Sequence, residues 1–239
     1  MISVIVPALN EASHIEDCLR SLKDQSIKSE CYEIIVVDGG SVDDTPSIAR
    51  KYADKVIIQK SPGIGGARRD GAAIAKGEIL AFTDADTTVP PTWLEVIEKN
   101  LEDHDASSGP IIFVDHSLKA LIIQYWRKLY RFLSIFNFYY IIGANMAIRR
   151  DIYWSAGGHS NISLLDDYDL SHKLFKNGYS TVYDSEQVVY TSSRRADKLI
   201  TYAITVAYGH YHYRISKDHS KLLDYPKADE MSLRCIFRF

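Results

Sequence analysis

Short apolar runs alternate with amphipathic stretches through the first hundred residues, and this alternation constrains the fold more than any other feature. The runs that predict strands buried on both faces lie at 2–7, 33–37, 56–58 and 79–83. The helices predicted between them lie at 15–22, from 45 onward, at 67–75, and from 91 to about 104. Strands that alternate with helices favour an α/β fold with a mostly parallel, doubly wound sheet.

The second half of the chain is less regular. Apolar runs predict strands at 111–114 and 144–148, and a short strand before Thr191. The predicted helices lie at 118–136, at 167–177 with Gly178 as a stop signal, and at 197–217. Because no internal repeat, low-complexity segment or linker interrupts the sequence, we expect a single domain over 1–239.

Composition excludes several classes of protein. The chain has 239 residues, 46% of them hydrophobic, which is enough for one sizeable α/β core. Its formal net charge of -3 does not suit a nucleic-acid-binding protein. Three widely spaced cysteines indicate a reducing compartment rather than a disulfide framework. No window is long and apolar enough for a membrane span, and the N-terminus resembles a strand rather than a signal peptide.

Acidic side chains follow three of the predicted strands. Glu11 comes after the first strand, Asp38 ends the second, and Asp84 and Asp86 end the fourth. Ligands of open α/β sheets bind at the carboxyl ends of the strands, so we expect these groups to converge. Clustered carboxylates repel one another and favour a cation with a preference for oxygen, such as Mg²⁺ or Mn²⁺. A solvated turn is the alternative for an isolated Asp-x-Asp, and Asp38 on the neighbouring strand favours a site.

The segment Gly63-Ile64-Gly65-Gly66-Ala67-Arg68 begins like a dinucleotide-binding motif. Arg68, however, replaces the third small residue, and the segment follows the third strand, so a dehydrogenase is not favoured. A Gly-rich turn that leads into a helix, with Arg68 and Arg69 in its first turn, could bind phosphate. A flexible turn with two solvated arginines remains the alternative.

Five ordered motifs resemble family 2 glycosyltransferases. They are Val4–Glu11; Ile34–Ser41 with Asp43-Asp44-Thr45; Gly66–Gly71 with Ala75–Glu78; Asp84-Ala85-Asp86 with Pro90, Pro91, Trp93 and Leu94; and Asp166–Leu170. Arg69 and Asp70 depart from the usual Asn and small residue, and Asp166 departs from the usual Glu. The resemblance covers roughly residues 2–190.

The resemblance implies a GT-A-type, Rossmann-like fold with a helical C-terminal extension, a UDP- or GDP-sugar donor, and Mn²⁺ or Mg²⁺. In one domain, 1–115 would bind the nucleotide sugar, 116–195 would supply the acceptor side and base, and 196–239 would form the extension. By the resemblance, Pro7, Ala8 and Glu11 would line the nucleotide pocket, Asp38 would contact the nucleobase, and Arg68 would lie near the diphosphate. Asp84 would bind the ribose or the metal, and Asp86 the metal. Asp166 would contact substrate, and Asp167 would be the catalytic base.

An inverting transfer of a single sugar is the expected reaction. A carboxylate such as Asp167 can take the proton of an attacking hydroxyl, while a cation stabilises the leaving diphosphate. Gln-x-x-Arg-Trp, the signature of processive synthases, is absent from the C-terminal third. Two alternatives stay open: acidic capping of a helix for Asp166 and Asp167, and a non-catalytic nucleotide-sugar-binding or membrane-associated module for the whole chain.

The acceptor side is less determined. The predicted helix 118–136 carries a basic stripe beside Trp and Tyr, which fits a membrane interface and a core helix equally well. The acceptor is accordingly a glycan hydroxyl or a polyprenyl-type phosphate. Arg194 and Arg195 are candidates for a phosphate, with a solvated loop as the alternative. We expect a cytoplasmic protein, with peripheral membrane contact through 118–140 if that segment faces lipid, and packing or homo-oligomerisation through 202–213.

Overall fold

The computed structural model describes residues 1–114, 140–192 and 199–223, apart from the side chains of 199–204. The predicted helix 118–136, the predicted phosphate-binding residues Arg194 and Arg195, and the chain from 224 onward lie outside the described residues.

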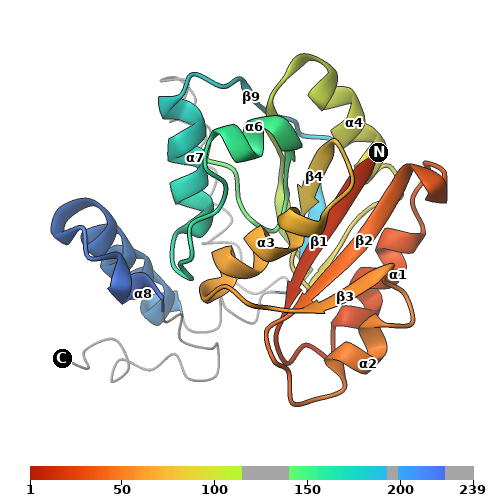
Figure 1. Ribbon diagram of the computed structural model, residues 1–239, viewed down its shortest axis with the longest axis horizontal. Helices are drawn as coiled ribbons and strands as arrows, with labels where there is room; N and C mark the ends of the chain where they lie inside the picture. The colour runs from red at the N-terminus through yellow and green to blue at the C-terminus, as the bar shows by residue number, and fades with distance from the viewer. Residues whose placement is uncertain (115–139, 193–198, 224–239) are drawn as a thin grey trace.

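A seven-stranded sheet with the strand order β3-β2-β1-β4-β8-β6-β9 forms the centre of the molecule (Figure 1). β1 (Ile2–Ala8) lies parallel between β2 (Tyr32–Asp38) and β4 (Ile79–Phe82), and β3 (Lys55–Ile58) pairs with β2. A short η1 turn (Ser29–Cys31) precedes β2. β1 and β2 are buried along their whole length, which explains why their sequences are continuous apolar runs.

The other half of this sheet is mixed in direction. β8 (Met146–Arg149) is antiparallel to both β4 and β6 (Ala106–Ser108), and β9 (Thr181–Tyr183) is parallel to β6 at the edge. The strand predicted at 144–148 is therefore present, but it begins at Met146. β6 and β9 were not predicted, because three-residue segments are too short to show a hydrophobic period.

A second, three-stranded sheet has the order β5-β10-β7. Its strands are β5 (Thr87–Thr88), β7 (Ile111–Phe113) and β10 (Val189–Thr191). The strands predicted at 111–114 and before Thr191 are confirmed as β7 and β10. β5 follows Asp86 directly, so the small sheet fixes the segment that leaves the carboxyl end of β4.

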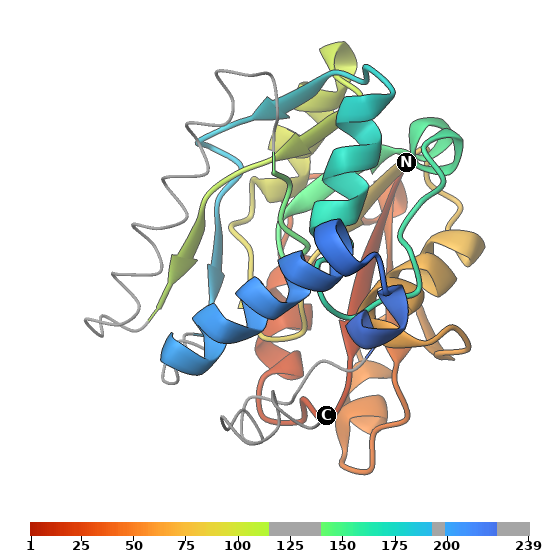
Figure 2. The same ribbon diagram turned by 90° about the vertical axis from the view of Figure 1, so that its left-hand side faces the viewer.

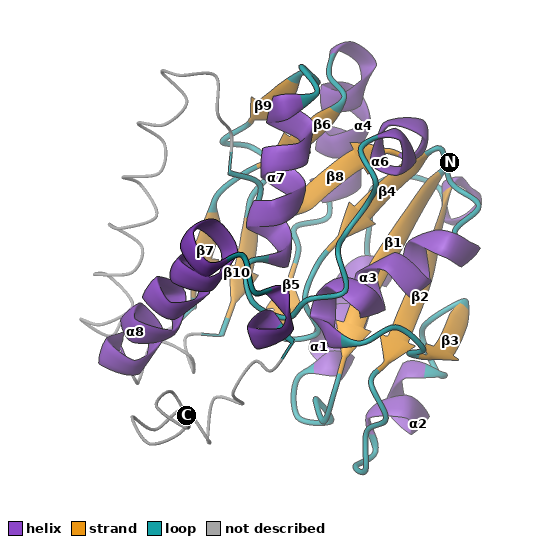
Figure 3. Ribbon diagram, turned by 60° about the vertical axis from the view of Figure 1, so that its left-hand side comes forward, coloured by secondary structure: helices purple, strands orange, loops and turns teal. Residues whose placement is uncertain are grey.

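Helices cover both faces of the large sheet (Figure 3). On one face α1 (Ile15–Lys23), α2 (Thr45–Ala49) and α4 (Trp93–Asp103) share a buried cluster with Val4 and Val6 of β1. On the other face α3 (Gly63–Ile74), α6 (Arg150–Ser155) and α7 (Asp166–Lys176) pack with Ile5 and Phe82. These elements confirm the helices predicted at 15–22, from 45 onward, at 67–75, from 91 to about 104 and at 167–177, and α6 is an addition.

The glycine-rich segment before Arg68 is helical rather than a loop. α3 begins at Gly63, four residues earlier than the predicted Ala67, so the prediction that Arg68 lies in the first turn is wrong. A Cβ on Gly65 would lie 2.2 Å from the backbone oxygen of Ser160, and the amide of Gly65 donates to the oxygen of Ile162 at 2.9 Å. The glycines therefore let the start of α3 pack against 160–162.

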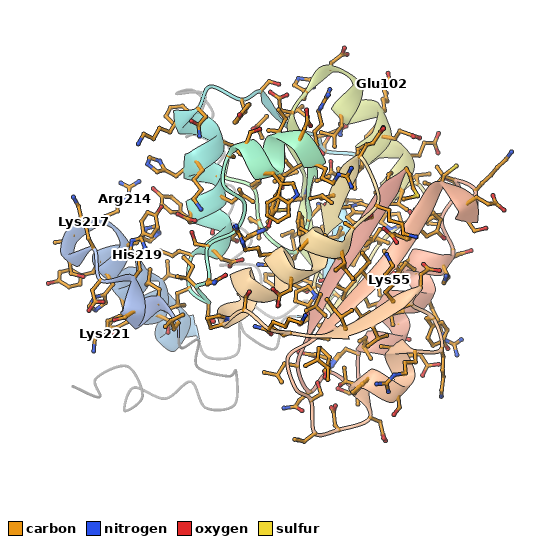
Figure 4. The ribbon with its side chains drawn as sticks, viewed as in Figure 1. Lys55, Glu102, Arg214, Lys217, His219 and Lys221 are labelled. Atoms are coloured by element: carbon orange, nitrogen blue, oxygen red, sulfur yellow. The ribbon has the colours of Figure 1, made fainter. Side chains whose placement is uncertain are left out.

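The C-terminal part packs beside α7 (Figure 2). It consists of α8 (Leu199–His210), η4 (Tyr211–Ser216) and η5 (His219–Leu222), so the single helix predicted at 197–217 is divided. Lys217, with φ of 55°, makes the turn between η4 and η5, and Figure 4 shows Lys217 and Lys221 on the outer side of this segment. Among the described residues, no helix combines the length and apolarity needed to cross a bilayer.

Candidate active site

The carboxyl ends of β1 and β2 lie side by side, as predicted. Ala8 is the ladder partner of Asp38, and the amide of Gly39 donates to the oxygen of Ala8 at 2.8 Å. Pro7 and Ala8 are buried, and Asp38 is 5% exposed. The Asp38 carboxylate accepts from the amide of Ser41 at 3.2 and 3.3 Å, which holds it at the mouth of the sheet.

The two loops that follow these strands are hydrogen-bonded to each other. Asn10, with φ of 54°, accepts from the amide of Val42 at 2.9 Å, and its own amide donates to Ser41 Oγ at 2.9 Å. The amide of Glu11 donates to Thr45 Oγ1 at 2.7 Å. Glu11 is thereby fixed beside the carboxyl end of β1, at the edge where the sequence placed it.

Asp84 and Asp86 point to the accessible side of the segment after β4. The intervening Ala85 is buried, whereas both aspartates are partly exposed; the amide of Thr87 donates to the oxygen of Asp84 at 3.1 Å, so this segment is a turn. Thr191 Oγ1 of β10 donates to Asp86 Oδ1 at 3.4 Å. The small sheet therefore anchors Asp86, and Asp84 and Asp86 lie at the same edge as Asp38.

Arg68 joins this edge to the start of α7. Its Nη2 donates to Asp84 Oδ1 at 2.7 Å and its Nη1 donates to Asp166 Oδ2 at 2.5 Å, although the side chain is only 3% exposed. A Cβ on Gly143 would lie 2.3 Å from Arg68 Nη2, so the guanidinium is packed against a backbone. Burial opposes the charge of Arg68, but Asp166 and Asp84 outweigh it and raise its pKa.

Asp167 lies in the first turn of α7, next to Asp166, and is partly exposed. Its carboxylate accepts from Tyr140 Oη at 2.9 Å, from the amide of Tyr168 at 2.8 Å and from the amide of Gly143 at 3.3 Å. Burial raises the pKa of Asp167 and that of Asp166, the latter to about 7. Both carboxylates accept hydrogen bonds from donors outside α7. Capping of the α7 N-terminus, the alternative role for Asp166 and Asp167, does not predict such donors.

A buried histidine that the sequence did not reveal lies behind Asp166. His159 Nδ1 is 3.1 Å from Tyr153 Oη, and its Nε2 is 3.9 Å from Asp166 Oδ2. Burial, and then the charge of Arg68, lower the pKa of His159 well below its usual value, so the ring is neutral. In the sequence, His159 is a lone histidine after two glycines and shows no ligand spacing. Tyr140 is the last residue of an aromatic run, which does not indicate a contact with Asp167.

Arg69 and Asp70, the two departures from the family pattern, hold loops. Arg69 Nη1 donates to the backbone oxygen of Gly157 at 2.7 Å, and its guanidinium lies 5.3 Å from the ring centre of Trp154. Asp70 accepts from the amides of Lys60 and Ser61 at 2.5 and 2.8 Å. These contacts join Arg69 and Asp70 to loops and not to Asp84.

Asp84 and Asp86 are the candidate metal ligands of this site. Within 1–114, 140–192 and 199–223, no group of three or more His, Cys, Asp or Glu side chains is arranged to hold an ion. A pair of partly exposed carboxylates fits a hard cation that takes one or two protein oxygens and fills its remaining positions with phosphate oxygens and water, as Mg²⁺ does. The donor set therefore fits such an ion only in company with a phosphate-bearing ligand.

A sequence model described as "Glycosyl transferase family 2" matches residues 3–157. Glycosyltransferase AglE of Haloferax volcanii is 38% identical over 100 residues, which are 39% of this chain and 33% of that protein. Human dolichyl-phosphate beta-glucosyltransferase is 30% identical over 159 residues, which are 59% of this chain and 48% of that protein. The chain thus spans less than half the length of these relatives.

Among solved structures, the mannosyltransferase PcManGT of Pyrobaculum calidifontis, in complex with GDP-Man and Mn²⁺, superimposes with a TM-score of 0.69. It shares 23% identity, and the alignment covers 96% of this chain and 66% of that one. At this identity the likeness concerns the fold, and it supports the GT-A-type α/β arrangement predicted from the sequence.

Proposed function

This chain belongs to glycosyl transferase family 2, and from that premise we propose that it transfers one sugar from a nucleoside-diphosphate sugar to an acceptor with inversion at the anomeric carbon. Asp38 and Asp84 would bind the nucleoside, Asp84 and Asp86 the metal and diphosphate region, and Asp167 would be the general base. Pro7, Ala8 and Glu11 line the same edge and would complete the nucleotide pocket.

The observation that carries this proposal is the double ion pair of Arg68. It connects Asp84, at the carboxyl end of β4, with Asp166, the neighbour of Asp167. A donor seated at the strand ends would thus have its leaving group and its reacting carbon near one carboxylate. Arg68, which the resemblance assigned to the diphosphate region, would act on the donor through Asp84 and Asp166 rather than by binding phosphate directly.

The chemistry follows from two charges. A hydroxyl attacks the anomeric carbon only as it loses its proton, and the partly exposed Asp167 has a carboxylate that can accept it. Burial raises the pKa of Asp167, which strengthens it as a base. A divalent cation held by Asp84 and Asp86 would supply positive charge for the departing diphosphate. One displacement inverts the configuration, and no second nucleophile is required.

The acceptor is proposed to be either a glycan hydroxyl or a lipid phosphate of the polyprenyl type. The relative whose name specifies dolichyl phosphate supports the second class. A phosphate acceptor is already ionised and needs a base less than a hydroxyl does. The proposed donor is a UDP- or GDP-sugar, and the proposed ion is Mn²⁺ or Mg²⁺, the first of which is named with the P. calidifontis enzyme.

The test is hydrolysis and transfer with a panel of UDP-glucose, UDP-N-acetylglucosamine and GDP-mannose, with Mn²⁺ or Mg²⁺ and with EDTA. We expect turnover of one donor that EDTA abolishes, and a loss of at least about 100-fold in Asp86→Asn because the leaving group loses its cation. Asp103→Asn, which neutralises an exposed carboxylate at the end of α4, is the matched control and should retain activity.

Asp167→Asn then separates the acceptor classes. With a hydroxyl acceptor we expect kcat to fall by about 10² to 10⁴ while donor binding is retained. With a lipid phosphate the loss should be smaller. Absence of both binding and turnover with every donor would contradict the proposed function.

A further inference from the structure

The two oxygens of the Asp167 carboxylate have different surroundings. Oδ1 accepts two short hydrogen bonds, from Tyr140 Oη at 2.9 Å and from the amide of Tyr168 at 2.8 Å. Oδ2 accepts one long hydrogen bond, from the amide of Gly143 at 3.3 Å. Since each carboxylate oxygen has about two acceptor positions, Oδ1 is filled by described residues and Oδ2 retains capacity for a further donor.

Tyr140 is well placed to control this carboxylate. It comes from the segment before β8, whereas Asp167 belongs to α7, so the hydrogen bond fixes the side chain from outside its own helix. The Tyr140 ring lies 5.9 Å from the ring of Tyr168, so Tyr140 contacts the first turn of α7 through its ring as well as through its hydroxyl. The other two donors to Asp167 are backbone amides, which no substitution of a side chain removes.

The charged and titratable groups around Asp167 come from several elements. Asp166 precedes it on α7, Arg68 of α3 provides the opposing positive charge, Asp84 after β4 adds a negative charge, and His210 of α8 lies within electrostatic range. Among the described residues, the hydrogen bonds to the Asp167 carboxylate come from Tyr140 Oη and from the amides of Gly143 and Tyr168, and not from these groups. Tyr140 therefore provides the side-chain hydrogen bond to this carboxylate among the described residues.

We propose that Tyr140 is a positioning residue for the base: its hydroxyl saturates Oδ1 of Asp167 and so leaves Oδ2 as the oxygen that receives the acceptor proton. This inference rests on the proposed function of Asp167. Tyr140 also stabilises the charged form of the carboxylate, because a donated hydrogen bond favours the anion. Its removal raises the pKa of Asp167 and confines the active base to higher pH.

The experiment compares the pH dependence of kcat in Tyr140→Phe and in the wild type, with the donor that the panel identifies. We expect the acid limb to move to higher pH by about one unit, which is the effect of losing one hydrogen bond to a charged group. We also expect kcat above the limb to fall several-fold, with the KM for the donor unchanged, because the hydroxyl contacts the base and not the donor.

Tyr213→Phe is the matched control. Tyr213 of η4 donates to Asp169 Oδ1 at 2.7 Å, so this variant also removes a tyrosine hydroxyl from a carboxylate in the first turn of α7. Asp169 is not the base, and the acid limb should stay where it is in the wild type. If both variants shift the limb equally, or if neither does, Tyr140 has no specific role in positioning the base.

A second readout does not require turnover. The carboxyl ¹³C shift of Asp167, assigned by comparison with Asp167→Asn, gives its pKa directly in the ligand-free protein, and this value should rise in Tyr140→Phe. An unchanged value overturns the proposal even if the enzyme is inactive, which separates its failure from failure of the proposed function. If Tyr140→Phe does not fold, 3-fluorotyrosine at position 140 keeps the shape with a stronger donor, and the pKa should then fall.

Discussion

At the scale of single residues, Arg68 determines the charge balance of the site. It is nearly excluded from solvent and ion-paired on two sides, with Asp84 and Asp166. A buried ion pair contributes little net stability compared with an apolar replacement of both partners, yet removing one partner leaves an uncompensated charge in a poorly solvated place. We therefore expect a substitution of Arg68 to destabilise the protein more than it would if this arginine were solvated.

Arg68→Met should lower the free energy of unfolding by about 3–5 kcal/mol at neutral pH, because Asp166 loses its counterion. Arg69→Met is the matched control, since Arg69 contacts backbone oxygens and the Trp154 ring at the surface, and it should cost about 1 kcal/mol. Urea denaturation of both variants measures the difference. Equal losses would contradict the assignment of the buried double ion pair.

The sequence predicted the residues whose position follows from a local rule. Asp38 ends β2, Asp84 and Asp86 follow β4 closely, and parallel strands bring their carboxyl ends to one edge. Tyr140 and His159 were not predictable in this way. Tyr140 is 27 residues from its partner Asp167, and His159 reaches Asp166 through an irregular loop, so neither pair follows a helix or strand period. Their roles depend on how the second half of the chain folds back.

At the scale of elements, the loop 160–165 connects three parts of the molecule. It receives the amide of Gly65 at the start of α3, leads into α7, and donates the amides of Ser163 and Leu164 to the oxygen of Leu222. Leu222 is fully buried with Ile162 and Leu164. The tertiary contact with this loop also explains why α3 begins at Gly63, where glycine content alone favoured a loop.

Leu222→Ala should weaken the docking of η5 by about 2–4 kcal/mol, because a buried leucine leaves a cavity. We expect faster hydrogen exchange at the amides of Ser163 and Leu164, with little change at β1 and β2. Leu223→Ala changes the next residue, which is 37% exposed, and should leave these amides protected. Uniform acceleration across the large sheet would instead indicate that Leu222 supports the whole fold.

At the scale of the whole molecule, a buried amide network joins the two sheets. Asn145, just before β8, accepts from Trp93 Nε1 at 2.9 Å and donates to the backbone oxygens of Pro110 and Gln187 at 3.2 and 2.6 Å. Pro110 precedes β7 and Gln187 lies near β10, so a single side chain links the large sheet, α4 and the small sheet. Such a network stabilises only when every member is paired.

Asn145→Ala should lower the free energy of unfolding by about 2–4 kcal/mol, because the Trp93 donor and two backbone oxygens lose a partner in the interior. Asn100→Ala is the control: its Nδ2 reaches Gln187 Oε1 at 3.4 Å from the periphery of the network, and its loss should cost less than about 1 kcal/mol. Thermal and urea unfolding of the two variants, followed by far-UV circular dichroism, measure the difference.

The strand order of the large sheet also bears on the order in which its parts form during synthesis. β3, β2, β1 and β4 are neighbours in the sheet and are all encoded before residue 83. During synthesis these four strands can pair before the later strands and helices have left the ribosome, since N-terminal units fold first. Asp166 is 98 residues beyond Arg68. The ion pair of Arg68 with Asp84, which follows β4 directly, can therefore form early, whereas the ion pair with Asp166 forms only when α7 has emerged.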